Sequence, residues 1–225
     1  METDKKYKLT DECITIGNKK LYRIESLKDF AFIKKGDKGG FVESEENLSQ
    51  VGSCWIYNDT KVCGNAWVFG DAKVCGDAMV YGNAMVYGDA KVCGDAMVYG
   101  NAMVFKNAMV YGNAEVFGDA EIYDNVRVYG NAEVFGNVHI KGDADISSIS
   151  DYIFFKNWWS SGRCFTWTRS NNMWSVGCFY GTGEELIAKA YKDSEISGKE
   201  YELVVKYVES ILKDGNTTTI VNKNY

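Results

Sequence analysis

Apolar residues recur at every sixth position through the middle of the chain. From Ile56 to Ile146 each repeated unit has six positions. The first is an aliphatic residue, the second is variable, the third is usually Gly, the fourth is usually Asn or Asp, the fifth is usually Ala and the sixth is variable. One unit reads Val74-Cys-Gly-Asp-Ala-Met, and the 90 positions from 56 to 145 hold fifteen units without a gap. A short, unbroken period predicts a solenoid, in which copies of one small structural unit stack on each other.

The order of residues within the unit explains how such a solenoid would form. Between Ala78 and Tyr81, strand alternation points Ala and Val to one side and Met and Tyr to the other. The Gly with Asn or Asp that follows supplies a corner, because these residues tolerate positive φ. A chain that turns after every short strand coils into a prism with Ala and Val inside. The sequence therefore predicts a mainly β protein containing a parallel β-helix.

The repeated Gly-Asn-Ala and Gly-Asp-Ala units resemble the hexapeptide-repeat family, whose members form a left-handed parallel β-helix of triangular section. The resemblance implies three hexapeptides per coil, so fifteen units make five coils. A sixth, imperfect coil is expected to start near Ser44, because Leu48 and Cys54 take the inward position held later by Ala. The family includes acyltransferases and γ-class carbonic anhydrases. In its uninterrupted form the repeat is similar to repeat proteins of bacteriophages and prophages.

The repeat divides the chain into three parts. Residues 1–43 lack it and are expected to cap the open N-terminal end of the β-helix, which spans 44–146. Residues 147–225 predict a small α+β module of three strands and two helices. The strands are expected at 152–155, 163–169 and 173–179, and capping boxes at Thr182–Glu185 and Ser197–Glu200 predict the helix starts.

Outward side chains 18 positions apart lie on adjacent coils, roughly 4.8 Å apart, which sorts them onto three faces. One face carries a block of aromatic and Met side chains that we predict to be an interface: Trp67, Phe69, Met85, Tyr87, Met103 and Phe105. Each of its four aromatic side chains has a surface of about 150–250 Å². If half of that surface is exposed, the block presents about 300–500 Å², which matches the largest apolar patches of monomeric proteins. We expect identical subunits (a trimer or a dimer), the C-terminal module or a partner to cover the block, and three-fold packing is what the family resemblance implies. The alternative is that aromatic ladders only stabilise the stacked strands.

Tryptophan and arginine cluster in the C-terminal part of the chain. We predict a partner-binding surface made by Trp158, Trp159, Arg163, Trp167, Arg169 and Trp174. Arg163, Trp167 and Arg169 would share one strand face by alternation, and both residue types are enriched in binding hot spots. The alternative is a small sheet whose Trp side chains pack under the helices, with Arg at the strand ends.

The net charge of −6 belongs to the repeat region. Residues 50–146 carry six basic and twelve acidic side chains, whereas the segments on either side are balanced. An acidic rod does not suit a DNA-binding protein, which must neutralise phosphates, so no direct DNA binding is expected. The charge suits a protein that meets a basic surface or imitates nucleic acid, and it equally suits an ordinary solvated surface.

Cysteine usage and hydropathy favour the cytoplasm. No apolar run is long enough to span a membrane, and the N-terminal residues begin no signal peptide. Seven Cys without metal-ligand spacing indicate a reducing cytosol, and we predict that all are free thiols, including Cys75 and Cys93 on adjacent coils. Asp59, Asp77 and Asp95 stack along one corner, but the corner needs such residues anyway, so no metal and no cofactor is predicted.

The sequence offers one candidate for an enzymatic function. Acyltransferases of the family typically use a His as general base and bind acyl-CoA between subunits. The only His here, His139, lies outward in the last coil without a carboxylate at a diagnostic spacing, so no catalytic residue is predicted. We expect a non-enzymatic binding protein with a bacterial host protein as partner. The phage resemblance suggests a phage-encoded antagonist of a host defence system, of the anti-CRISPR type. The alternative is a hexapeptide-repeat acyltransferase that uses acyl-CoA.

Overall fold

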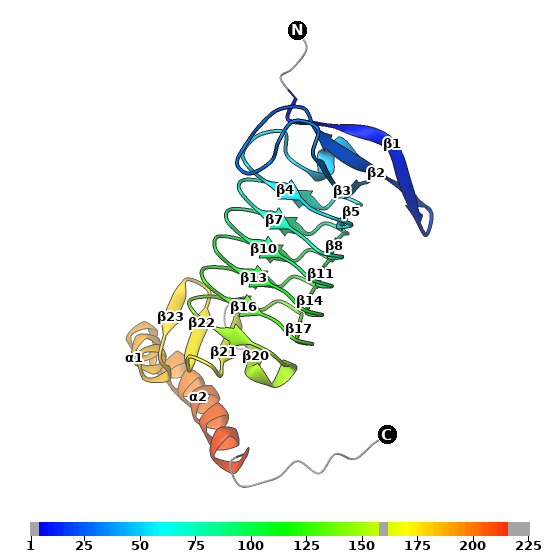
Figure 1. Ribbon diagram of the computed structural model, residues 1–225. Coiled ribbons are helices and arrows are strands. Elements are labelled where there is room, and N and C mark those ends of the chain that lie inside the picture. Colours follow the sequence, from blue (N-terminus) through cyan, green and yellow to red (C-terminus); the bar gives the residue numbers. More distant parts are fainter. Residues whose placement is uncertain (1–4, 158–161, 216–225) are drawn as a thin grey trace, which may run out of the picture.

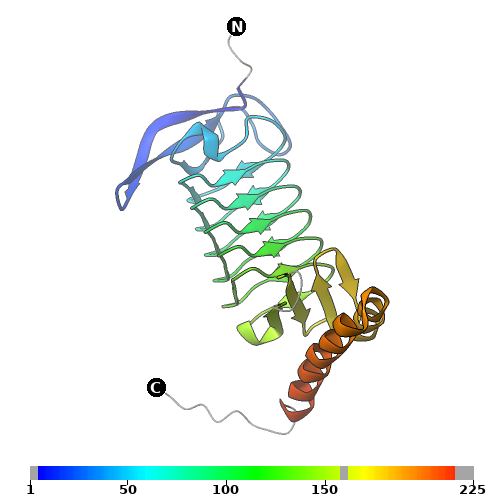
Figure 2. The ribbon, with the colours of Figure 1, turned by 180° about the vertical axis from the view of Figure 1, so that it is seen from behind.

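The computed structural model describes residues 5–157 and 162–215, and its central part is a parallel β-solenoid of about six turns (Figure 1). A cap built from strands covers the N-terminal end, and an antiparallel sheet with two helices covers the other end (Figure 2). The predicted fold class is confirmed, since the chain is mainly β with a small α+β module after the solenoid.

Three parallel sheets form the three faces of the solenoid, and consecutive strands go to consecutive faces. The first face contains β4 (Trp55–Ile56), β7 (Lys73–Val74), β10 (Lys91–Val92), β13 (Met109–Val110), β16 (Arg127–Val128) and β19 (Asp145–Ile146). The second face contains β5 (Lys61–Val62), β8 (Met79–Val80), β11 (Met97–Val98), β14 (Glu115–Val116) and β17 (Glu133–Val134). The third face contains β6 (Trp67–Val68), β9 (Met85–Val86), β12 (Met103–Val104), β15 (Glu121–Ile122) and β18 (His139–Ile140).

The interior of the solenoid is made of small aliphatic side chains, as the repeat predicts. Ala96 and Val98, for example, are completely buried, and so are their counterparts in every coil. Adjacent coils are joined by backbone hydrogen bonds such as the one from Met97 N–H to Ala114 C=O, 2.9 Å long. Because each N–H points to the following coil, the N-terminal end of the solenoid leaves carbonyl groups open and the C-terminal end leaves N–H groups open.

The N-terminal segment supplies hydrogen-bond donors to the open carbonyl groups. It consists of the hairpin β1 (Tyr7–Ile16) and β2 (Lys19–Ser26), then β3 (Lys38–Val42) and the 3-10 helix η1 (Glu45–Asn47). Strand β3 pairs with β5 and so extends the second face towards the hairpin. The Tyr7 hydroxyl donates to Leu48 C=O at 2.7 Å, and Lys6 Nζ donates to Cys54 C=O at 2.9 Å. This segment is the cap that the sequence predicts.

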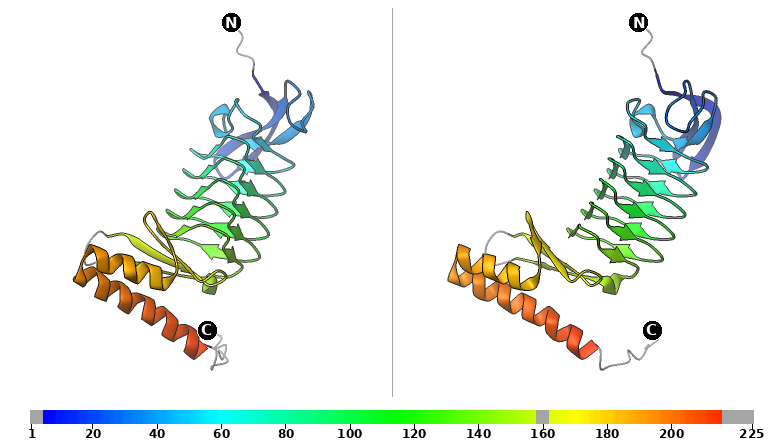
Figure 3. Two further views of the ribbon diagram at one scale, coloured as in Figure 1. Left: turned by 90° about the vertical axis from the view of Figure 1, so that its left-hand side faces the viewer. Right: turned by 60° about the vertical axis from the view of Figure 1, so that its left-hand side comes forward.

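The C-terminal module supplies acceptors to the open N–H groups. Its parts are η2 (Ile149–Asp151), β20 (Tyr152–Lys156), β21 (Cys164–Thr168), β22 (Met173–Val176), β23 (Phe179–Gly181), α1 (Gly183–Asp193) and α2 (Glu195–Gly215). The N–H of His139 donates to Thr166 Oγ at 3.3 Å, and that of Asp145 donates to Ser170 Oγ at 2.8 Å. Figure 3 shows the sheet of the module against the last coils and α2 extending away from the solenoid.

Two details of the module differ from the prediction. The sheet has a fourth strand, β23, because Gly177 adopts a φ of 55° and reverses the chain directly after β22. Helix α2 begins at Glu195 rather than after Ser197, because Ser194 Oγ accepts the N–H of Ser197 at 3.1 Å and caps the helix earlier. The capping box at Thr182 and Glu185 is present at the start of α1, as predicted.

Candidate functional site

The chemistry available to a ligand lies on the outer surface of the solenoid. Its interior is a closed apolar core, so a partner can reach only the two outward side chains of each hexapeptide and the corner residues. Strand alternation fixes which side chains these are, and the in-register stacking places like residues in continuous columns. The three faces therefore form the candidate functional surfaces, each with its own composition.

The third face carries a set of stacked rings, which we call the third-face ladder: Phe69, Tyr87, Phe105 and Tyr123 in one column, and Trp67, from the neighbouring column, stacked on Phe69. Successive ring centroids are 4.1, 4.7, 4.8 and 4.7 Å apart, and the rings from Phe69 onward are within 14° of parallel. Because each ring covers the next, the ladder presents mainly ring edges to solvent. The ladder thus brings together the aromatic residues of the predicted interface, with Met85 and Met103 in the neighbouring column.

The exposure of this block decreases along the face. Trp67 at the N-terminal end is 43% exposed, while Met85 and Phe105 are partly buried by their neighbours. At the other end the C-terminal module reaches the ladder, since Lys141 Nζ lies 5.9 Å from the Tyr123 ring centre and 5.7 Å from that of Tyr180. Burial in this position lowers the pKa of the Lys141 ammonium. Among the described residues, the contact between the module and the ladder lies at this end, so the predicted role of the block as an interface stays a prediction.

The second face contains a groove that sequence reasoning missed. The groove has a volume of about 580 Å³ and lies between the end of the hairpin, at Ile16 and Lys19, and the outward side chains of the first three coils. Its lining on the solenoid includes Cys63, Met79 and Tyr81. The alternating apolar residues of the hairpin indicate a buried face, but no sequence signal identifies what that face packs against. Lys19 at the rim donates to Glu43 at 2.6 Å, and this hydrogen bond raises the pKa of its ammonium.

A second column of stacked rings continues from the groove along the second face: Tyr81, Tyr99, Phe117 and Phe135. Their centroids are 4.8, 4.9 and 5.2 Å apart. The Tyr99 hydroxyl donates to Glu115 Oε2 at 2.9 Å. Burial and this hydrogen bond both raise the pKa of the Tyr99 phenol. Glu115 itself stacks in register on Glu133, so two carboxylates of like charge lie on adjacent strands.

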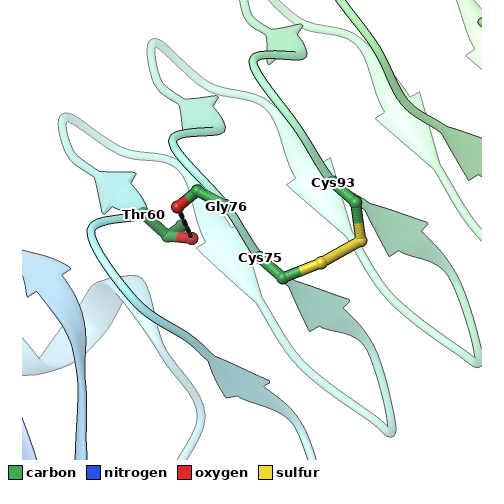
Figure 4. Close-up of a disulfide and its surroundings, with 4 residues drawn as sticks. All are labelled: Thr60, Cys75, Gly76 and Cys93. Atoms are coloured by element: carbon green, nitrogen blue, oxygen red, sulfur yellow. Dashed lines mark hydrogen bonds between the residues drawn. A yellow bond between two sulfur atoms is a disulfide. The ribbon is translucent and has the colours of Figure 1, made fainter.

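The first face corrects the prediction that all cysteines are free thiols. Cys75 and Cys93 form a disulfide between adjacent coils, with their Cα atoms 4.6 Å apart (Figure 4). The prediction relied on a reducing compartment and on unfavourable bridge torsions between in-register parallel strands, but Figure 4 shows the two sulfur atoms joined between adjacent coils. The other five cysteines, Cys13, Cys54, Cys63, Cys164 and Cys178, are free.

The corners of the solenoid are joined by side-chain amide ladders. Asn83 Nδ2 donates to Asn101 Oδ1 at 2.9 Å, and Asn101 Nδ2 donates to Asp119 Oδ1 at 2.9 Å. Two of the stacked acids considered for metal binding have cationic side chains beside them: Asp59 accepts from Arg23 at 3.0 Å, and Asp77 lies 3.4 Å from Lys61. Within residues 5–157 and 162–215, no group of three His, Cys, Asp or Glu side chains is arranged to hold a metal ion.

The C-terminal surface predicted from Trp and Arg is partly wrong. Trp167 and Trp174 are each only 2% exposed, because they pack in the core between the sheet and the two helices. Arg163 and Arg169, at the two ends of β21, are exposed. Trp158 and Trp159 lie outside the described residues. Alternation along β21 does place Trp167 on one face of the sheet, as predicted. The two helices cover that face, so Trp167 is not available to a partner.

The only histidine has a carboxylate partner that the sequence analysis missed. His139 Nδ1 lies 2.9 Å from Glu121 Oε2, and both side chains are about one-third or less exposed, at 30% and 26%. The two residues are 18 positions apart and therefore occupy the same column on adjacent coils. The period of the repeat could have identified this pair. A carboxylate on Nδ1 orients an imidazole and leaves Nε2 for other contacts.

Comparison with known proteins agrees with the repeat architecture. Residues 72–88 and 78–94 match the YdcK beta solenoid repeat family. A comparison with curated proteins found no match. The chain is a β-solenoid repeat protein. In the part of the chain that the structure describes, no helix has the length and apolar character needed to cross a membrane.

Proposed function

We propose that this β-solenoid repeat protein is a non-enzymatic binding protein and that its partner is another protein, held on the third face. The observation that carries the proposal is the third-face ladder with Trp67 at its exposed end and the Met column beside it. Aromatic and Met side chains are enriched at protein interfaces, and Met adapts its shape to a partner. The face also lies on strands that are held rigidly by hydrogen bonds on both sides.

The geometry of the ladder favours a protein over a nucleic acid or a sugar. Recognition of single-stranded nucleic acid depends on bases that stack on open ring faces. In the ladder, successive rings from Phe69 to Tyr123 cover each other's faces, so mainly edges are available. The excess of acidic side chains in residues 50–146 also opposes phosphate binding. Ring edges and Met side chains are suited to apolar side chains of a protein.

The partner class that we propose is a basic, nucleic-acid-binding protein of a bacterial host, for which this protein acts as a defence antagonist. Support for this narrower proposal comes from the charge of the solenoid, twelve acidic against six basic side chains. Carboxylates at the corners, such as Asp89 and Asp95, are exposed and can meet a basic groove. Binding of this kind is expected to weaken steeply as salt is raised, because exposed charges are screened within about 8–10 Å.

The proposed binding face can be tested with two variants of the same residue type. Met85→Glu places a charge beside the ladder on the third face, and Met109→Glu places the same charge at the equivalent repeat position on the first face. Each protein, and the unaltered one, is immobilised and used to capture proteins from a bacterial lysate for mass spectrometry. We expect a captured protein that is lost with Met85→Glu and retained with Met109→Glu. Equal capture by both variants, or no specific capture by any, would contradict the proposal.

The His139–Glu121 pair supports a second candidate, an acyltransferase that uses His139 as general base. A base oriented by a carboxylate is the arrangement that general-base catalysis needs. The test is transfer of an acetyl group from acetyl-CoA to amine or hydroxyl acceptors, compared with the His139→Ala protein. Transfer that disappears in this variant would favour the enzyme over the binding protein. Equal background rates for both proteins would remove the second candidate.

A further inference from the structure

The second face differs from the other two in how charge is arranged along the solenoid axis. One outward column reads, in consecutive coils, Lys61, Met79, Met97, Glu115 and Glu133. The column is therefore basic at the end near the hairpin, apolar in the centre and acidic at the end near the C-terminal module. Beside it, the column of stacked rings is apolar throughout.

We propose that the second face binds a second copy of this chain in an antiparallel, two-fold arrangement with Met97 at the centre. A two-fold axis along the strand direction reverses the order of the coils and keeps each column opposite itself. Lys61 then faces Glu133 of the second copy, and Met97 faces Met97 of the second copy. The proposal does not depend on the proposed function, which uses the third face.

Within the part of the chain that the structure describes, the two carboxylates at the acidic end have no cationic partner. Glu133 is exposed and stacks in register on Glu115, and like charges on adjacent strands destabilise each other. Glu115 accepts from the Tyr99 hydroxyl at 2.9 Å, whereas no ion pair to Glu133 is found in the described part of the chain. Lys61 lies 3.4 Å from Asp77, whose side chain is 66% exposed, so this pairing is weak and solvent-screened. The antiparallel copy brings each Lys61 to an unpaired Glu133.

The same charges argue against parallel packing. Any parallel arrangement, including the three-fold packing implied by the hexapeptide-repeat resemblance, places the two ends of the column at matching heights. Lys61 would then lie level with Lys61, and Glu133 with Glu133, in every subunit. Like charges opposite each other at an interface cost several kcal/mol and suppress wrong pairings. The antiparallel two-fold arrangement is the one in which this column is complementary to itself.

The groove under the hairpin acquires an occupant in this arrangement. It is lined by Gly64 and Gly82 at the corner, and the same corner continues along the solenoid to Gly136. Beyond Gly136 the ring of Phe154 continues this corner one coil further along the axis, where an added Cβ at Gly136 would lie 3.2 Å from the ring, and Phe154 is 39% exposed. Reversal of the coils sets Gly136 of the second copy opposite Gly64 and brings its Phe154 to the end of the groove that the hairpin forms. A volume of about 580 Å³ is ample for one aromatic side chain.

The mass in solution, measured by sedimentation equilibrium and light scattering, tests the proposal. The unaltered protein is expected at twice the chain mass of 25.2 kDa. Met97→Glu places two carboxylates together at the two-fold axis and should weaken the dimer about 100-fold. Met103→Glu carries the same substitution on the third face and should leave the dimer intact. Circular dichroism and thermal unfolding establish that both variants fold.

Charge reversal distinguishes the antiparallel arrangement from other dimers. Lys61→Glu and Glu133→Lys should each weaken the dimer, whereas the double variant should restore it, because the two new charges again face each other between copies. In a parallel dimer the double variant would still set like charges together. Phe154→Ala should weaken the dimer as well, and Phe32→Ala, which removes a ring that is 86% exposed elsewhere on the surface, should not.

Three results would overturn the proposal. The first is a monomer or a trimer of the unaltered protein at concentrations of about 100 µM, where dimers with dissociation constants in the micromolar range are populated. The second is equal dissociation by Met97→Glu and Met103→Glu. The third is a folded double variant, Lys61→Glu with Glu133→Lys, that stays dissociated.

Discussion

Replacing Gly100 by Ala tests how tightly the corners of the solenoid are constrained. Gly100 has a φ of 72°, in the left-handed region that L side chains rarely adopt. A Cβ at this position would lie 3.0 Å from Gly118 N and 3.1 Å from Gly118 O on the following coil. The substitution therefore imposes both a strained backbone and a close contact between two coils, without changing any polar group.

The expected loss of stability follows from these two effects. A left-handed backbone costs a non-glycine residue about 1–2 kcal/mol. Crowding against Gly118 adds to this, so we expect the free energy of unfolding to fall by about 1–3 kcal/mol. The repeat itself sets an upper limit on this loss of stability, because three units already carry a non-glycine residue at the same position. These residues are Asn58, Lys106 and Asp124, with φ values of 53°, 57° and 62°. The corner can therefore accept a side chain, at a cost.

A matched control uses the corner that already carries a side chain. Lys106→Ala leaves the backbone type unchanged and removes the bridge to Asp124, which is 2.6 Å long with side chains 55% and 31% exposed. Such a pair contributes at most about 1 kcal/mol. Gly100→Asn is a second control, and it should cost less than Gly100→Ala because Asn tolerates the left-handed region better.

The assay is thermal and urea unfolding followed by circular dichroism for the wild type and the three variants. For a chain of this length, a loss of 1–3 kcal/mol lowers the unfolding midpoint by about 2–12 °C. If Gly100→Ala unfolds within about 0.3 kcal/mol of the wild type, the corner is not constrained as described. The same conclusion follows if Gly100→Ala is more stable than Lys106→Ala.

Three further outcomes are expected. Thiol titration of the denatured, unreduced protein should find five thiols, and seven after reduction, because Cys75 and Cys93 are bonded; seven without reduction would contradict the disulfide. Burial raises the pKa of the Tyr123 phenol from 10.0 to about 12. Above pH 10 the unfolded chain therefore releases a proton that the folded chain retains, and the free energy of unfolding should fall between pH 10 and 12. This loss should be smaller in Tyr123→Phe, and an equal loss in both proteins, measured by urea unfolding at each pH, would assign it to other groups. Gly142→Ala should increase backbone hydrogen exchange in the C-terminal module, because an added Cβ would overlap the Tyr180 hydroxyl and separate Tyr180 from Lys141. Unchanged exchange would show that Tyr180 does not hold the module on the solenoid.

The pattern of the repeat is sufficient to predict most of the solenoid. Inward Ala and Val, corner Gly and the outward columns all follow from a period of six, because the same environment recurs in every coil. Contacts between coils are equally regular, since a residue always meets the one 18 positions further on. The His139–Glu121 pair obeys this rule and was accessible from the sequence. The Cys75–Cys93 bond obeys it as well, but the choice between thiols and disulfide required the orientation of the two side chains.

The ends of the solenoid were less accessible to sequence reasoning. Both faces of β21 are largely buried, with Phe165 and Trp167 on one side and Thr166 and Thr168 on the other, so alternation alone could not show which side the helices cover. The burial of Trp167 and Trp174 in the module core was decided by that packing. The fourth strand depended on a single turn at Gly177, which is too local a signal to separate from an ordinary loop.

What the sequence by itself determined is therefore the solenoid and the composition of its three faces, because periodic contacts connect positions at one fixed separation. What only the tertiary structure decided is the position of the non-periodic parts. Ile16 and Lys19 are more than 40 positions from Cys63 and Tyr81, yet they form one groove. Such contacts depend on the direction in which a hairpin leaves the first coil, and that direction results from packing rather than from any local preference along the chain.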